Sequence, residues 1–179
     1  MAHLHTKPNE HDLTASAYIL LEDRGELKMW FHLHRKLNKW LQFGGHVEHI
    51  ENPWTAILHE IEEEAGYLSS QLKLLQPKKF IGDLDGAIIH PADVCINTHH
   101  FPGLEHYHTD IAYAFVAEQR PSTRPQKGES QELKLLSRQQ IVELEPDQIP
   151  SSTRQIALYI FDEIHKSWVP TRLSVFKIK

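Results

Sequence analysis

The stretch that decides the fold is "GGHVEHIENPWTAILHEIEEEAGY", residues 44–67. Near its end, four glutamates occupy five consecutive positions as Glu60, Glu62, Glu63 and Glu64. Like charges three or four residues apart on a helix repel each other by roughly 0.2–0.5 kcal/mol per pair. Carboxylates concentrated in this way therefore need either full solvation or a partner of opposite charge.

The same stretch carries the start and stop signals of a helix. Asn52 can cap its N-terminus, Pro53 suits its first position, and Gly66 suits the position just past its end. Between these signals, apolar residues recur at helical spacing: Trp54, Ile57, Leu58, Ile61 and Ala65. The pattern predicts an amphipathic helix with one buried side.

A helical wheel separates the glutamates into two kinds. Glu60 and Glu64 lie one turn apart with Glu63 beside them, whereas Glu62 points away toward solvent. Clustered carboxylate oxygens are the ligands that Mg²⁺ prefers. A solvated acidic helix face is the alternative, and the acidic string alone does not decide between the two.

The bulk properties fit one globular domain spanning residues 1–179, with a flexible or irregular segment at 1–12 and an unassigned tail at 170–179. The formal net charge of −5 argues against a nucleic-acid partner, which would require clustered positive charge. Cys95 is the single cysteine, so an internal disulfide is excluded. Because the sequence shows neither a signal peptide nor a run long enough to span a bilayer, we expect a cytoplasmic protein without a membrane partner.

The rest of the chain mixes strands and helices without regular alternation, which indicates an α+β fold with a mixed sheet covered by helices. We expect a β-hairpin at residues 13–34, and then a basic loop at residues 35–45. Further strands are predicted within residues 67–76, 77–83, 92–101, 108–118 and 131–137, and an exposed loop at 120–130. Helices are predicted at 138–144 and 151–168, the second capped by Ser151 or Ser152.

Residues 45–67 resemble the Nudix box of the Nudix hydrolases, G-x5-E-x7-R-E-U-x-E-E-x-G-U, where U is apolar. Gly45 and Glu51 match its first two fixed positions, and the others follow at the family's spacing: Glu60, Ile61, Glu63, Glu64, Gly66 and Tyr67. One position departs, because His59 stands where the family has arginine. The preceding "WLQFGG", residues 40–45, is similar to the family's W-x-x-P-G-G, with Phe43 in place of proline.

The resemblance implies a fold, an activity and a cofactor. The fold would be an α/β/α sandwich around a mixed β-sheet, in which the box forms a loop, a helix and a loop. Nudix hydrolases cleave a pyrophosphate bond in a nucleoside diphosphate linked to another group, such as a nucleotide sugar, a dinucleotide or a nucleoside triphosphate. They usually need Mg²⁺ or Mn²⁺, which we therefore expect as the cofactor, and homodimers are common among them.

The resemblance also implies roles for individual box residues. Glu60 and Glu64 would be metal ligands, and Glu63 a ligand or the residue that orients or deprotonates water. The Gly45 carbonyl oxygen would be a further ligand. Glu51 would support the loop and the entry into the helix. A cation held there would bridge phosphate oxygens and lower the pKa of a bound water molecule.

A further acid from a later loop often takes part in this family. Glu129 is our candidate for a catalytic base or an extra metal ligand, with Glu132 as the second choice. The alternative for both is an exposed loop acid without a role in the reaction.

Substrate-binding candidates lie on both sides of the box. Arg35 and Lys39 could contact phosphate oxygens or could belong to a solvated basic loop. Trp40 could stack on a base or anchor the loop. His106 and His108 could line the substrate cleft, as the resemblance suggests; a zinc site is the less favoured hypothesis, since no spacing there matches a closed zinc site.

His59 raises the main alternative for function. The arginine of the family pairs with box carboxylates through a rigid, always charged fork, whereas histidine is shorter and only partly protonated near neutrality. Neighbouring glutamates would raise its pKa. The competing hypothesis is therefore a catalytically weakened Nudix-fold module with a nucleotide-binding or regulatory role.

Overall fold

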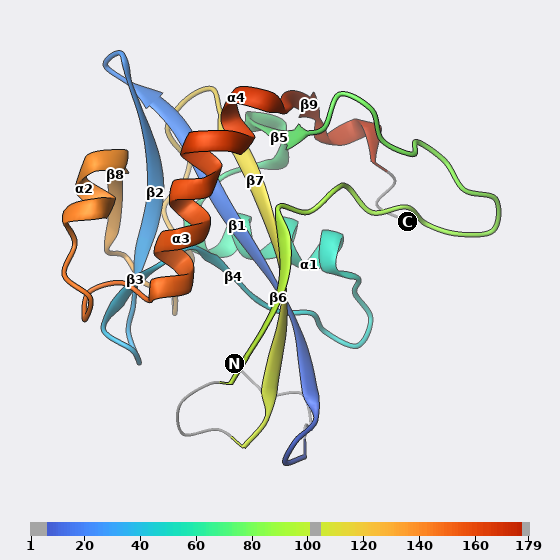
Figure 1. Ribbon diagram of the computed structural model, residues 1–179, viewed down its shortest axis with the longest axis horizontal. Coiled ribbons are helices and arrows are strands. Elements are labelled where there is room, and N and C mark those ends of the chain that lie inside the picture. The colour runs from blue at the N-terminus through green and yellow to red at the C-terminus, as the bar shows by residue number, and fades with distance from the viewer. Residues whose placement is uncertain (1–6, 101–104, 177–179) are drawn as a thin grey trace.

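The computed structural model describes residues 7–100 and 105–176, and its centre is a mixed β-sheet (Figure 1). The main path through the sheet is β3-β2-β1-β7-β5-β9, with β4 paired to β1, β6 to β7 and β8 to β2. The strands are β1 (His11–Asp23), β2 (Glu26–His34), β3 (Lys39–Leu41), β4 (Phe43–His46), β5 (Leu72–Gln76), β6 (Cys95–His100), β7 (Tyr107–Ala117), β8 (Leu133–Ser137) and β9 (Val169–Arg172). Strands β1 and β7 run parallel along nearly their whole length, and the other pairs are antiparallel.

The predicted hairpin is confirmed, because Asp23 at the end of β1 is in register with Glu26 at the start of β2. Strand β1 begins at His11, so it takes in the last two residues of the segment 1–12. Residues 1–6 of that segment lie outside the described part of the chain. The long β1 is what joins the two halves of the sheet, since it pairs with β2, β4 and β7.

Two predictions about strands and loops were wrong. The expected loop at residues 35–45 contains β3 and most of β4, which pair with β2 and β1. These strands are three and four residues long, too short for their alternation to show in the sequence. Residues 77–83, expected as a strand, form none, although an isolated bridge joins Leu84 to Ala87 just beyond them.

Helices cover both faces of the sheet (Figure 1). On one face, α1 (Pro53–Glu60) continues into a π-helical segment, η1 (Ile61–Ala65). On the other face lie α2 (Arg138–Glu143), α3 (Ser151–Tyr159), the π-helical η3 (Ile160–Ile164) and α4 (His165–Ser167). Two short 3₁₀ turns complete the described elements, η2 (Ser69–Gln71) and η4 (Leu173–Val175).

The strand alternation of β1 supplies both cores. One set of its residues, including Ala17 and Ile19, packs with Trp54, Ile57 and Ile61 of the α1–η1 helix. The alternate set packs with α3 and η3 in the second core, whose members include Tyr18, Leu20, Ala157, Ile160 and Phe161. The α/β/α sandwich and the α+β class predicted from the sequence are thereby confirmed.

The caps explain where the helices begin and end. The Asn52 side-chain oxygen accepts hydrogen bonds from the backbone N–H groups of Trp54 and Thr55, both at 3.0 Å, as predicted. Gly66 ends η1 with a left-handed φ of 71°. The predicted serine cap of α3 was wrong: Pro150 occupies the N-cap position, and the Ser151 hydroxyl instead accepts from the Gln155 side chain. Among the described residues, no helix combines the length and the apolar character needed to cross a membrane.

Candidate functional site

Glu60, the last residue of α1, lies directly against the glycine pair of β4. A Cβ atom added to Gly45 would overlap the Glu60 carboxylate, so any other residue here would require the carboxylate to move. Burial and the charge of Glu63 raise the pKa of Glu60 from 4.5 to about 7. Without a bound cation, ionising this carboxylate therefore costs free energy.

Glu64 is the most deeply buried acid of the box, with 3% of its surface exposed. Its Oε2 accepts a hydrogen bond from the Gly44 backbone N–H at 2.9 Å, and its Oε1 lies 3.6 Å from His32 Nδ1. Burial raises the pKa of Glu64 well above its ordinary value, although the Gly44 N–H opposes the shift. Burial and neighbouring His34 lower the pKa of His32 to about 4, so this ring is neutral near pH 7 and supplies no counter-charge.

His59 contacts two box acids at once. Its Nε2 lies 3.1 Å from Glu63 Oε1, and its Nδ1 lies 3.4 Å from Glu51 Oε1. Partial burial acts to lower the pKa of His59, but the charges of Glu63, Glu51 and Glu60 outweigh it, and the pKa is raised. The histidine thus links the loop before the helix to the helix itself, and it holds the Glu63 carboxylate in position.

The loop at residues 120–130 folds over this cluster and carries Glu129. The Gln126 backbone N–H donates to the Glu63 carbonyl oxygen at 2.7 Å. The Arg35 guanidinium donates to the carbonyl oxygens of Gly128 at 3.0 Å and Glu129 at 2.8 Å. In addition to burial, the charge of Glu129 contributes to the raised pKa values of both Glu60 and Glu64, so this acid belongs electrostatically to the cluster.

The donor set fits a hard divalent cation. Glu60, Glu63 and Glu64 offer carboxylate oxygens, and in addition to burial the charge of Glu63 contributes to the raised pKa of both Glu60 and Glu64. The strand that carries Gly45 lies directly beside Glu60. A cation among them would remove the mutual repulsion and favour the ionised forms. Glu62 is exposed, as the helical wheel indicated.

The other predicted substrate residues lie elsewhere. Arg35 is engaged with the loop backbone rather than directed at the carboxylates. Lys39 lies in β3 opposite His34. Trp40 is a buried member of the second core, with Lys134 Nζ 4.3 Å from its ring centroid, an arrangement that suits an anchor better than a base-stacking surface.

His106 and His108 gather with two residues that the sequence analysis did not single out, Asp12 and His46. His106 Nε2 lies 3.0 Å from Asp12 Oδ2 and 3.3 Å from His108 Nε2. Strand alternation turns His46 to the face of β4 opposite its neighbour Gly45, so this group lies across the sheet from the glutamates. The signal that could have found it is the period-two run of polar residues in "HDLTAS" and "HYHTD".

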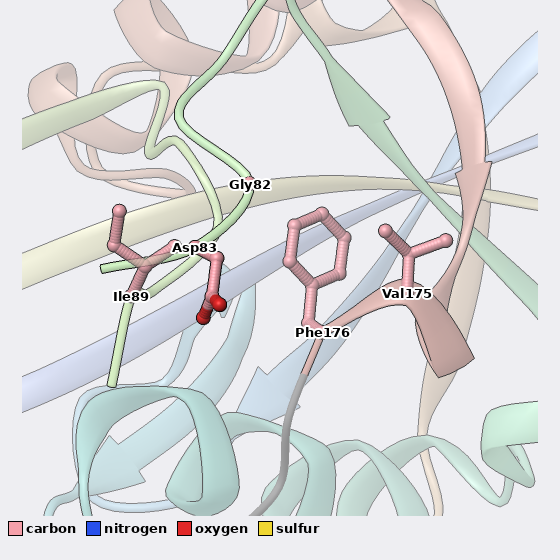
Figure 2. Close-up of a pocket in the computed structure, with 5 residues that line it drawn as sticks. All are labelled: Gly82, Asp83, Ile89, Val175 and Phe176. Atoms are coloured by element: carbon pink, nitrogen blue, oxygen red, sulfur yellow. The ribbon is translucent and has the colours of Figure 1, made fainter. Parts of the chain in front are cut away.

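A small pocket elsewhere is ruled out as a nucleotide site. It lies between the loop after β5 and the C-terminal segment, where Gly82, Asp83 and Ile89 face Val175 and Phe176 (Figure 2). Its cavity volume of about 30 Å³ has room for little more than a water molecule, whereas ligand pockets typically measure about 300–1,000 Å³.

Comparison with known proteins identifies the family. The NUDIX domain model matches residues 10–158, and the chain therefore belongs to the NUDIX family. This confirms the enzyme class predicted from the sequence, a Nudix-type pyrophosphohydrolase. A comparison with curated protein sequences gave no match.

Solved structures support the same fold. A NUDIX-family hydrolase from Clostridium perfringens is 26% identical, with a TM-score of 0.67 over 84% of this chain and 96% of that one. An Ap4A hydrolase binary complex from C. elegans is 15% identical, with a TM-score of 0.60 over 82% and 92% of the two chains. The NUDIX domain of Shewanella oneidensis NrtR complexed with ADP ribose is 12% identical, with a TM-score of 0.59 over 85% and 86%.

Proposed function

We propose that this protein is a Mg²⁺- or Mn²⁺-dependent hydrolase of a small nucleotide-type diphosphate, one in which a nucleoside diphosphate is linked to another group. The observation that carries the proposal is the electrostatic coupling of Glu60, Glu63 and Glu64 beside Gly45. Three partly or fully buried carboxylates repel a polyanionic substrate, unless a cation reverses the local field. The same cluster then becomes a binding site for a pyrophosphate.

Each side chain has a defined part in the proposed reaction. Glu60, Glu63, Glu64 and the Gly45 carbonyl oxygen hold the cation, which when bound screens the phosphate charge and lowers the pKa of a coordinated water molecule. Glu129, on the loop over the cluster, is the proposed base that accepts the proton from the attacking water.

Two further residues act through these acids. His59 fixes the Glu63 carboxylate, and Arg35 fixes the loop backbone at Glu129. Both are positioning residues, since His59 contacts the Glu63 carboxylate and Arg35 contacts the backbone of the loop that carries Glu129.

The substrate class comes from chemistry and from the related structures together. One structural neighbour is an Ap4A hydrolase and another is a complex with ADP ribose. Dinucleotides, nucleotide sugars and nucleoside triphosphates are therefore the compounds to assay. Lys39 remains a candidate for contacting phosphate. Cleft lining by His106 and His108, which lie across the sheet from the glutamates, stays a prediction from the resemblance.

The test is a hydrolysis assay of purified protein with Mg²⁺ over that panel of compounds, with product identification. We expect the wild type to hydrolyse at least one compound. Glu63→Gln and Glu64→Gln should lose most of this activity, whereas Glu62→Gln should keep it. Glu62 is the matched control because it lies on the same helical segment but is exposed. Absence of turnover on every compound, or equal losses in all three variants, would contradict the proposal.

A second candidate function follows from His59. A nucleotide-binding module with weakened hydrolysis would bind a compound of the panel without cleaving it, and His59→Arg would restore turnover. The double contact of His59 with Glu51 and Glu63 favours the active enzyme, because the histidine reaches the acids that an arginine would hold. A homodimer and a cytoplasmic location stay predictions.

A further inference from the structure

A second group of metal-binding side chains lies across the sheet from the glutamates. Asp12, His46 and His108 come from β1, β4 and β7, and one ligand atom of each lies within 4.8 Å of the others. All three residues are buried. We propose that they bind a transition-metal ion of the zinc class, with His106 as the fourth ligand.

The spacing of the ligand atoms matches a tetrahedral ion. Bonds from zinc to histidine nitrogen or carboxylate oxygen measure about 2.0–2.2 Å, which places the ligand atoms of a tetrahedron about 3.4 Å apart. Asp12 Oδ2 lies 3.5 Å from His46 Nε2 and 3.0 Å from His106 Nε2. His106 Nε2 lies 3.3 Å from His108 Nε2. These three pairs of ligand atoms thus already lie at about the required spacing, and Asp12, His46 and His108 are within 4.8 Å of one another.

The chemistry of the donors selects the kind of ion. Imidazole nitrogens suit zinc and its neighbours in the first transition row, whereas Mg²⁺ prefers oxygen. A ligating histidine must be neutral. Asp12 supplies the negative charge that partly balances the ion.

The fold explains why residues so distant in sequence meet here. Asp12 and His108 are register partners in the parallel β1–β7 pair. His46 lies opposite Thr14, which is on the same face of β1 as Asp12. A bound ion would therefore fasten three strands together directly after the glycine pair of the box. It would lie on the opposite face of β4 from Glu60, which makes it distinct from the proposed Mg²⁺ site.

The experiment measures zinc in the full chain purified without chelators, by mass spectrometry of the metal content and by competition with a chromogenic chelator. We expect one zinc ion per chain. His46→Ala and His108→Ala should weaken zinc affinity by more than the roughly 10–100-fold typical of losing an outer-shell partner. Glu60→Gln, at the other cluster, and His165→Ala, at an exposed position, should bind zinc as tightly as the wild type.

A spectroscopic measurement covers the case in which the buried variants fail to fold. The wild-type chain loaded with Co²⁺ should show the intense visible absorption of a tetrahedral ion with nitrogen ligands. A weak octahedral spectrum, an absence of zinc binding, or zinc lost in Glu60→Gln but kept in His46→Ala would overturn the proposal. These outcomes do not depend on hydrolysis, so the proposal can fail or hold independently of the proposed enzymatic function.

Discussion

Removing divalent cations should make the stability of this protein fall as the pH rises, through Glu60. The folded chain raises the pKa of Glu60 from 4.5 to about 7, so it binds a proton more tightly than the unfolded chain does. Below pH 4.5 both states are protonated and the shift has no effect. Between pH 4.5 and about 7 the unfolded state ionises first, and the free energy of unfolding falls. Over its full range, a pKa shift of this size lowers the free energy of unfolding by about 3 kcal/mol.

The assay is chemical denaturation in EDTA at pH 5 and pH 8, applied to the wild type and to Glu60→Gln. The lowered pKa values of His32 and His108 act in the opposite sense, because the stability they contribute is present above pH 6.5 and is lost as the pH falls toward 4. Both proteins share those histidines, so the difference between them removes their contribution and reports on Glu60 together with Glu64 and His59, whose pKa values its charge raises. We expect the wild type to lose about 2.5 kcal/mol relative to the variant from pH 5 to pH 8.

Mg²⁺ supplies the second half of the test. At pH 8 it should restore the stability of the wild type, since a cation favours the ionised carboxylates, and it should have a much smaller effect on Glu60→Gln. An equal change of the two proteins between pH 5 and pH 8, or a wild type that Mg²⁺ leaves unchanged at pH 8, would contradict this role of Glu60.

Three shorter predictions test other parts of the molecule. His59→Ala should lower turnover by roughly 10–100-fold, because Glu63 loses its positioning partner, whereas His59→Arg should keep it; steady-state kinetics at saturating Mg²⁺ would show equal rates if the contact had no role. Gly45→Ala should weaken Mg²⁺ binding measured by calorimetry, because its Cβ displaces the Glu60 carboxylate, and unchanged affinity would contradict this geometry. Trp54→Ala should reduce the free energy of unfolding by about 3–5 kcal/mol in urea, since the ring is fully buried; a loss below 1 kcal/mol would show that the core collapses around it.

The sequence predicted the box helix well because its signals are local. Asn52, Pro53 and Gly66 act on the backbone beside them. The spacing of the apolar residues, such as Trp54 and Ile57, indicates a helix without knowledge of what that helix packs against. The separation of Glu62 from the other glutamates followed from the same periodicity. For these residues, interactions within one helix were sufficient to predict the structure.

The parts that could not be predicted depend on contacts between distant segments. The strands β3 and β4 exist because β2 and β1 offer them backbone partners. The meeting of Asp12 with His108 requires the parallel register of β1 and β7, which no short motif encodes. The contacts of Arg35 could not be predicted for a similar reason, since its partners lie more than ninety positions away in the chain.

The loop that carries Glu129 is held largely through main-chain atoms. The Gln126 N–H donates to the Glu63 carbonyl oxygen, and the Thr123 N–H donates to that of Gly66. Arg35 donates to the carbonyl oxygens of Gly128 and Glu129. Main-chain atoms are the same whatever the side chain. Substitutions at exposed positions such as Gln126 and Lys127 should therefore leave these main-chain bonds intact and keep Glu129 in its place, whereas Gly128, with a left-handed φ of 116°, is not free to change.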